Sequence, residues 1–366
     1  MTMSSVEEFQ QQQQEEEEPP FKRLRDNEGN ASAVVAYRGP EEETNRTSSL
    51  PSPTMQLSGH KGSVYCLEYS PSGDTLASAG FDMNVLLWSH SDYNNFNVLE
   101  GHKNAILDLK WLNETHLITG SADKTLGYWD TATGDKIRSF KSHSMIVNAL
   151  DTAASTVGSR TTGTSSSSSS GSTMANPHLF VSASDDSTAK LWDVRSKRES
   201  ATLEHDFQVT AIALDGENQI VYTGGIDNTI TAWDIRNQSN KKTMGLRGHT
   251  DTITCLSLHP KSTHLLSNSM DHTIRTWDVR PFCAEPQRQC KQFVGATHNA
   301  EKGLIRAAWS PDGSMISCGS ADRMVRVFDE YSAEELYLLP GHKGCVNTVI
   351  FHPQENVIAR YVTSIQ

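Results

Sequence analysis

A short pattern that recurs along most of the chain constrains its fold more than any other feature. Each repeat opens with a histidine, often after a glycine, and closes with an aromatic residue six positions after an aspartate. The opening histidines are His60, His102, His143, His205, His249, His298 and His342, and the closing aromatics are Trp88, Trp129, Trp192, Trp233, Trp277 and Phe328. Neighbouring histidines are about 42 residues apart, so one structural unit recurs along the chain.

Short β-rich segments lie between these marks. Residues 64–69, 75–79 and 85–88 alternate in part between apolar and polar side chains. A turn sequence at 71–74 separates the first two of these segments. Helical periodicity is absent. A period of about 42 residues with a Gly-His start and a Trp-Asp end is typical of a WD-repeat β-propeller, in which each repeat forms one four-stranded blade. The seven histidines therefore predict an all-β propeller with seven blades.

Two segments do not fit a packed domain. Residues 1–52 are rich in Gln, Glu, Ser and Pro, and they contain too few large apolar side chains to offset the entropy of ordering. A run of Ser, Thr and Gly at about 153–175 accounts for the one long interval between histidines. We expect a disordered tail over 1–52, a propeller over 53–366 and a flexible loop inserted in its third repeat.

The seventh repeat is short. Residues 346–351 and 357–362 suffice for two strands, but the chain ends at Gln366 before another strand and its aromatic residue. A propeller removes its exposed edges by joining its first and last blades. In the WD-repeat family the N-terminus supplies the outer strand of the last blade, which here would be about 53–58. We expect a truncated last blade and a ring weakened at that seam.

The recurring His, Ser or Thr, Asp and Trp could be mistaken for the Ser-His-Asp triad of a hydrolase. An enzyme does not need five copies of an active site, and no G-x-S-x-G elbow or P-loop stands outside the repeats. We predict structural networks in which the indole N–H donates to the hydroxyl, and histidine links the hydroxyl to aspartate. The sets are His60, Ser78, Asp82 and Trp88; His102, Thr119, Asp123 and Trp129; His143, Ser182, Asp186 and Trp192; His205, Thr223, Asp227 and Trp233; and His249, Ser267, Asp271 and Trp277. The sixth repeat has Cys318 and Phe328 in place of the hydroxyl and Trp, which predicts an incomplete network.

A Trp-Asp-x-Arg motif ends three of the repeats, with its arginine at Arg195, Arg236 and Arg280. Two interpretations stay open. These arginines pair with nearby acids on the surface, which contributes little energy. Alternatively, they dock an adaptor protein, since arginine is favoured at interfaces. The second interpretation would make the chain a substrate receptor of a cullin-RING ubiquitin ligase.

Composition limits the classes of partner and ligand that the chain is expected to bind. The net charge of −12 disfavours direct contact with nucleic acid, and no apolar run is long enough to cross a membrane. Six cysteines without C-x-x-C spacing predict neither a metal site nor a disulfide framework, and we expect no cofactor and no small-molecule substrate. A basic cluster in the tail, Lys22, Arg23 and Arg25, is either a solvated charge cluster or a signal for nuclear import.

Several stretches are more particular than the repeat pattern. They are ASAGFD (77–82), GGIDNTITAWDIR (224–236), LLSNSMDHTIRTWDVRPF (265–282), WSPDGS (309–314) and GSADR (319–323). Through them, residues 55 to about 358 resemble the WD-repeat subunits of the U5 small nuclear ribonucleoprotein. The resemblance implies a nuclear, non-enzymatic scaffold in pre-mRNA splicing. It also implies binding to the largest U5 protein and other spliceosome subunits, with RNA contacted only indirectly. The Ser-rich insert and the short last repeat depart from that family.

Overall fold

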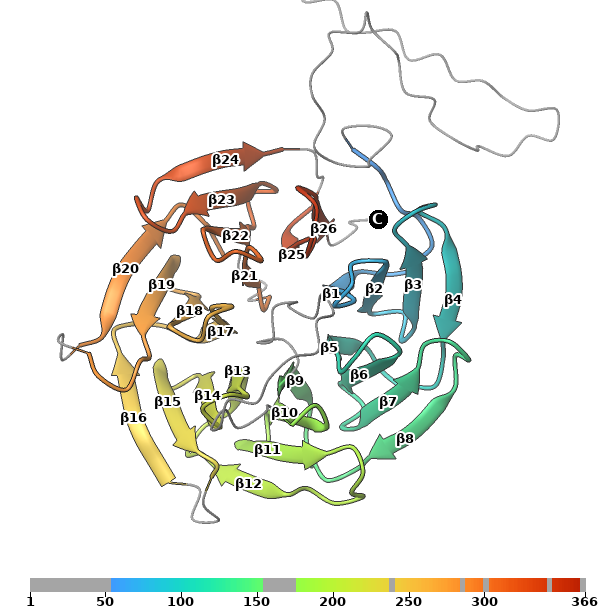
Figure 1. Cartoon of the computed structure of the whole chain (residues 1–366), viewed down its shortest axis with the longest axis horizontal. Helices are drawn as coiled ribbons and strands as arrows, with labels where there is room; N and C mark the ends of the chain where they lie inside the picture. Colours follow the sequence, from blue (N-terminus) through green and yellow to red (C-terminus); the bar gives the residue numbers. More distant parts are fainter. Residues whose placement is uncertain are drawn as a thin grey trace, which may run out of the picture. The chain divides into compact units, whose positions relative to one another are not determined.

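The computed structural model describes residues 54–153, 176–236, 241–283, 287–298, 303–340 and 344–362. Residues 56–366 group as one compact unit, in which antiparallel sheets stand around a common centre (Figure 1). The all-β WD-repeat propeller is confirmed. The tail predicted over 1–52 and residues 154–175 of the predicted insert lie outside the described residues, so their disorder stays a prediction. Within the described residues, no helix is long and apolar enough to span a membrane.

Six sheets have four strands each, and the first strand of each repeat lies nearest the centre (Figure 1). The strands are β1 (Val64–Tyr69), β2 (Thr75–Gly80), β3 (Val85–Ser89) and β4 (Asn95–Leu99); β5 (Ile106–Trp111), β6 (His116–Ser121), β7 (Leu126–Asp130) and β8 (Lys136–Phe140); β9 (Val147–Thr152), β10 (Leu179–Ser184), β11 (Thr188–Asp193) and β12 (Ala201–Glu204); β13 (Val209–Asp215), β14 (Ile220–Gly225), β15 (Thr229–Asp234) and β16 (Lys241–Arg247); β17 (Ile253–Leu258), β18 (His264–Ser269), β19 (Thr273–Asp278) and β20 (Gln289–Val294); and β21 (Ala307–Trp309), β22 (Met315–Gly319), β23 (Val325–Asp329) and β24 (Glu335–Leu339).

The predicted count of seven blades is wrong. The described residues form six complete blades, and those of the seventh repeat form a sheet of two strands, β25 (Val346–Phe351) and β26 (Ile358–Val362). The physical reason is that an opening histidine marks only the start of a repeat, whereas a complete blade also needs enough residues for four strands. The two strands lie close to the predicted ranges. Residues 54–63 contain no strand, so the described part of the predicted outer strand at 53–58 is not formed.

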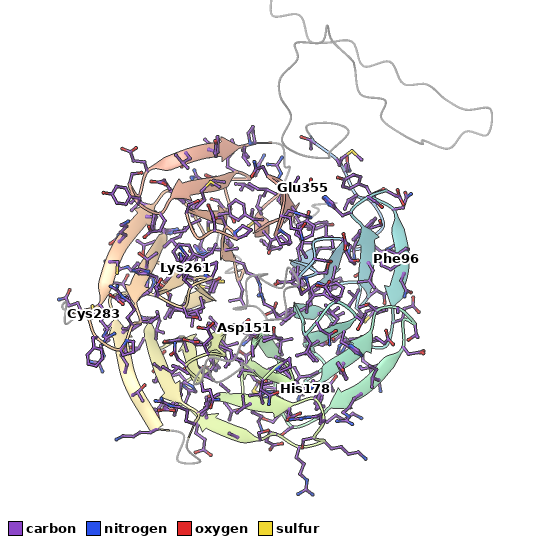
Figure 2. The ribbon with its side chains drawn as sticks, in the orientation of Figure 1. Phe96, Asp151, His178, Lys261, Cys283 and Glu355 are labelled. Carbon is purple, nitrogen blue, oxygen red and sulfur yellow. The ribbon has the colours of Figure 1, made fainter. Side chains whose placement is uncertain are left out.

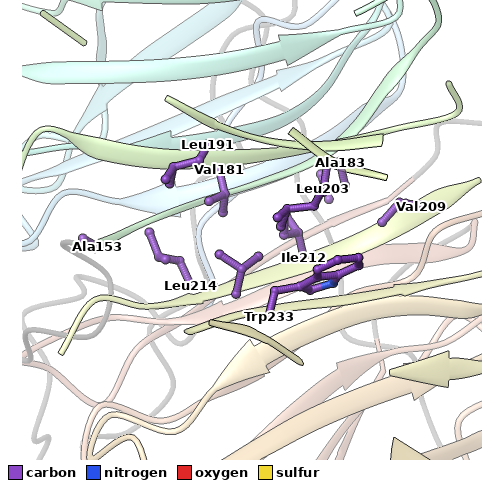
Figure 3. Packing of buried hydrophobic residues seen from close by; sticks show 12 residues of the cluster. Ala153, Val181, Ala183, Leu191, Leu203, Val209, Ile212, Leu214 and Trp233 are labelled. Carbon is purple, nitrogen blue, oxygen red and sulfur yellow. The ribbon is translucent and has the colours of Figure 1, made fainter. Parts of the chain in front are cut away.

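The hydrophobic core consists of layers between neighbouring blades. In one such layer, Val181 and Leu191 of the third blade meet Leu214 and Trp233 of the fourth (Figure 3). Inner strands are covered on both faces, and β9 and β13 are therefore buried at every position. Because each layer needs two blades, the sheets stabilise one another rather than folding around separate cores.

The two-stranded sheet still joins the ring to its first blade. Ile350 and Tyr361 pack against a cluster that contains Val64 and Trp88. His352 Nε2 donates a hydrogen bond of 3.1 Å to the carbonyl oxygen of Gly73. The inner part of the seam is therefore closed by contacts of the seventh sheet.

Candidate functional site: buried networks, exposed arginines and the central channel

In four blades the structure brings the predicted His, hydroxyl, Asp and Trp side chains together. In the second blade, Trp129 Nε1 lies 2.8 Å from Thr119 Oγ1, which lies 2.7 Å from His102 Nε2. His102 Nδ1 is in turn 2.9 Å from Asp123 Oδ2. The same links join His60, Ser78, Asp82 and Trp88; His143, Ser182, Asp186 and Trp192; and His249, Ser267, Asp271 and Trp277. Since a carboxylate can only accept, Nδ1–H donates to the aspartate, and in a neutral imidazole Nε2 then accepts the hydroxyl proton while the hydroxyl oxygen accepts the indole N–H.

The aspartate of each network also holds the loop that enters the blade. The backbone N–H of Lys103 donates to Asp123 Oδ2 at 2.9 Å. Burial acts to raise the pKa of Asp123, but the hydrogen bonds from His102, Lys103 N and Thr125 together hold it well below its usual range. The pKa values of Asp186 and Asp271 are lowered by the same kind of contacts. These carboxylates therefore stay ionised and keep accepting hydrogen bonds at neutral pH.

The fourth blade departs from this arrangement. Trp233 Nε1 donates to Thr223 Oγ1 at 2.8 Å, but the Thr223 hydroxyl donates to the carbonyl oxygen of Thr231. His205 Nε2 is buried without a hydrogen-bond partner. Burial, assisted by the Lys242 charge, lowers the pKa of His205 to about 4, and burial raises that of Asp227. The predicted set of the fourth blade is thus only half assembled.

The sixth repeat lacks a network, as its sequence suggests. Cys318 Sγ contacts the carbonyl oxygen of its neighbour Gly319. Both ring nitrogens of His298 are buried without partners, and burial, followed by the influence of His272, lowers its pKa to about 4. Phe328 packs into the layer that contains Cys318. His342, which opens the seventh repeat, lies outside the described residues.

The arginines of the Trp-Asp-x-Arg motifs pair with the aspartate of their own motif. Nε and Nη2 of each guanidinium contact the two carboxylate oxygens, and the Nη2 distance is 2.6 Å for Arg195, 2.6 Å for Arg236 and 2.5 Å for Arg280. The three arginine side chains stay 63%, 62% and 55% exposed. The structure therefore shows the local pairing, which for Arg195 and Arg236 is solvent-exposed and contributes little, whereas the Asp278 partner of Arg280 is buried. Lys22, Arg23 and Arg25 of the import prediction lie outside the described residues.

The inner strands around the centre of the ring carry a hydrogen-bonded belt that sequence reasoning missed. The second residue of an inner strand donates from its side chain to a backbone carbonyl of the next blade. The pairs are Asn148 with Val209, Thr210 with Ile253, Thr254 with Ile305, and Asn347 with Val64. The last pair crosses from the two-stranded sheet to the first blade. Comparing this one position across all repeats would have been the only signal for the belt in the sequence.

Arg306 extends the belt across the centre of the ring. Its Nη2 donates to the carbonyl oxygen of Leu107 at 3.0 Å and contacts that of Asn148 at 3.4 Å. Its Nη1 lies 2.8 Å from Asp108 Oδ1, and the Asp108 side chain is only 2% exposed. One side chain of the sixth blade thereby braces the second and third blades. Asp151, labelled near the middle of the ring in Figure 2, accepts the N–H of Leu214 in the next blade.

The described residues contain no group of three His, Cys, Asp or Glu side chains placed to hold a metal ion. Within the described residues, none of the six cysteines forms a disulfide bond.

Comparison with known proteins relates this geometry to a family. The family model of the WD domain, G-beta repeat, matches residues 51–89, 94–130, 134–193, 197–234, 240–278 and 290–329. The U5 small nuclear ribonucleoprotein 40 kDa protein of Dictyostelium discoideum is 44% identical over 90% of this chain and 88% of its own length. The pre-mRNA-splicing factor cwf17 of Schizosaccharomyces pombe is 44% identical over 86% of both chains. The human U5 small nuclear ribonucleoprotein 40 kDa protein is 44% identical over 86% of this chain and 82% of its own.

Proposed function

The chain belongs to the WD-repeat family that includes the U5 small nuclear ribonucleoprotein 40 kDa proteins, and from this premise we propose that it is a non-catalytic, protein-binding scaffold of the spliceosome. The observation that carries the proposal is the 44% identity over 90% of the chain to a protein of that name. The same relationship favours a nuclear location. Its partners would be proteins, among them the largest U5 protein, and RNA would be contacted only indirectly.

Burial of the network hydroxyls supports a role without catalysis. Ser78 is 3% exposed, and Thr119, Ser182 and Ser267 are 0% exposed. Each hydroxyl oxygen already accepts an indole N–H at 2.8 Å. A nucleophile must reach a substrate carbonyl, and these oxygens face the interior of a blade layer. Their placement favours stabilisation of the blade over acyl transfer.

Affinity purification tests the function. The full chain would be tagged in its own cells and purified at low salt, and co-purifying proteins and small RNAs would be identified. The proposal predicts U5 RNA together with the largest U5 protein. Purification without any U5 component would overturn it.

The same experiment tests the ligase alternative with a triple variant, Arg195→Ala, Arg236→Ala and Arg280→Ala. The relatives reported above are splicing proteins, so adaptor docking is not part of the proposal. Recovery of a cullin adaptor with the wild-type chain, lost in the triple variant, would replace the splicing function. Unchanged recovery of U5 components by both chains is the expected result.

A further inference from the structure

Two kinds of loop lie together at one end of the ring. One kind enters the inner strand of a blade and the other joins its second and third strands. In the third and fourth blades these loops expose three large apolar side chains: Met145 is 47% exposed, Phe207 is 55% exposed and Ile226 is 46% exposed. We call the loops at 143–146, 185–187, 205–208 and 226–228 the blade 3–4 rim.

Backbone and side-chain hydrogen bonds make this rim one continuous surface. The N–H of Ile226 donates to the carbonyl oxygen of Gln208, which places Ile226 beside the Phe207 loop. The N–H of His205 donates to the carbonyl oxygen of Ser187 at 2.9 Å, which extends the β11–β12 pairing, so the loop that leads to the fourth blade starts beside the 185–187 loop of the third. The N–H of Asp185 likewise donates to the loop that carries Met145, at Ile146. Loops from two blades are therefore held side by side.

The rim is also strongly acidic. Together with the equivalent loops of the fifth blade, 249–252 and 270–272, it contains six aspartates and no lysine or arginine. They are Asp185, Asp186, Asp206, Asp227, Asp251 and Asp271. The corresponding loops of the first two blades contain Lys61, Lys103 and Lys124 beside the aspartates Asp82 and Asp123. Lys242, on the outer strand β16, is a cation that acts on Asp227. One sector of this end is thus negative and apolar at once.

Packing within the propeller does not explain why the loop at 205–208 exposes its side chains. Asp206, Phe207 and Gln208 are all exposed, although they immediately precede a strand that is buried at every position. In the same blade, the network that fixes the loop elsewhere is only half assembled, with His205 Nε2 unpaired. Scattered exposed apolar residues are ordinary, but several on adjoining loops are typical of a binding surface.

We propose that the blade 3–4 rim binds an extended protein segment in which lysine or arginine residues alternate with large apolar side chains. The apolar side chains would pack on Met145, Phe207 and Ile226, and the basic groups would face the exposed carboxylates of Asp206, Asp227 and, on the fifth blade, Asp251. The proposal rests on the protein-binding role proposed above and names the chemistry of one partner. The negative charge repels nucleic-acid phosphates, so the segment is a protein.

A peptide-binding experiment tests the rim. The purified full chain would be titrated into a short fluorescein-labelled peptide that alternates Arg and Lys with Phe and Leu, and anisotropy would be recorded. A second peptide has the same charges but Ser at the apolar positions. The test variant is Phe207→Ser with Ile226→Ser. The matched control is Phe96→Ser, since Phe96 is 54% exposed on β4, in the outer layer of the first blade (Figure 2).

We expect the double variant to bind the apolar peptide about 10-fold or more weakly than wild type, as loss of anchor residues does at protein interfaces. Phe96→Ser should bind as wild type does, and the Ser peptide should bind wild type about 10-fold or more weakly. Asp206→Asn with Asp251→Asn should weaken binding and reduce its dependence on salt. Circular dichroism and the thermal midpoint of each variant would verify its fold.

Three results would overturn the proposal: no binding of the apolar peptide to wild type, equal binding by the double variant, or equal binding of the two peptides. The last would mean attraction by charge alone. The purification described above fails or succeeds independently of this titration. A rim that binds the peptide in a chain that recovers no U5 component would retain the surface and reject the splicing function.

Discussion

At the scale of single residues, the same four side chains at the same spacing do not always form the same contacts. The Trp-to-hydroxyl bond forms in all five sets, because each hydroxyl and each indole lie on neighbouring antiparallel strands at a register that the repeat spacing dictates. This half of each network could be predicted from sequence. The His-to-hydroxyl bond depends on the path of a loop, and His205 differs from His249 in that path although both have the expected partners in sequence.

Replacing each of these two histidines by phenylalanine compares the stability contributed by a complete network with that of an incomplete one. His249→Phe removes the buried hydrogen bonds that join His249 to the Ser267 hydroxyl and to the Asp271 carboxylate, so we expect a loss of about 1–3 kcal/mol in the free energy of unfolding. His205→Phe removes a buried, unpaired nitrogen and should change stability by less than about 0.5 kcal/mol. Urea denaturation at pH 7 measures both. Equal losses would show that His205 has a partner in solution.

The histidines with lowered pKa values predict a loss of stability in mild acid. Burial lowers the pKa of His205 to about 4 from the ordinary 6.5. The unfolded chain therefore binds more protons than the folded chain between about pH 6.5 and 4, and stability falls as the pH drops through this window. His205→Phe should flatten the fall, whereas His298 retains its own share. Urea denaturation at pH 7, 6 and 5 tests this, and an unchanged slope in the variant would contradict it.

At the scale of elements, the repeat pattern predicted the blades but not their number. Strand positions follow from β-rich segments between turns, and the two strands of the last sheet were among them. The count failed because each histidine marks only the start of a repeat, and the described residues after His342 form two strands and not four. Contacts across the seam were not predictable, since His352 and Gly73 are far apart in sequence and share no motif.

The seam should exchange its amide hydrogens faster than the rest of the ring. Among the described strands, β26 is hydrogen-bonded only to β25, whereas β6 is bonded to strands on both sides. Local opening needs fewer broken contacts at β26, so we expect weaker protection there. Hydrogen exchange followed by mass spectrometry compares the two strands directly. Equal protection of β26 and β6 would refute a seam weakened by the short last sheet.

At the scale of the whole molecule, the belt and Arg306 connect blades that are distant along the chain. Arg306 reaches carbonyl groups of Leu107 and Asn148, in the second and third blades. No local pattern in the sequence could show this, because the contact exists only once the ring has formed. The contacts at the centre of the ring are therefore the part of this fold that the sequence predicted least.

Removing Arg306 should destabilise the entire ring. In Arg306→Met, the buried carboxylate of Asp108 loses its cation, and we expect a loss of about 3–5 kcal/mol in the free energy of unfolding. Arg236→Met is the matched control, since it breaks the exposed Arg236–Asp234 pair and should lose at most about 1 kcal/mol. Asp108→Asn with Arg306→Met should lose less than the sum of the single changes. Denaturant titration measures wild type, the three single variants and the double variant, and similar losses for Arg306→Met and Arg236→Met would contradict the brace.

The packing of the first blade against the last sheet has a consequence during protein synthesis. Val64, Leu86 and Trp88 of the first blade find their apolar neighbours in Ile350, Ala359 and Tyr361. At translation rates of roughly 5–20 residues per second, those neighbours leave the ribosome on the order of tens of seconds after Trp88 does. Throughout that interval one apolar face of the first blade is exposed to solvent. We therefore expect a chaperone that covers this face to raise the fraction of chains that close the ring.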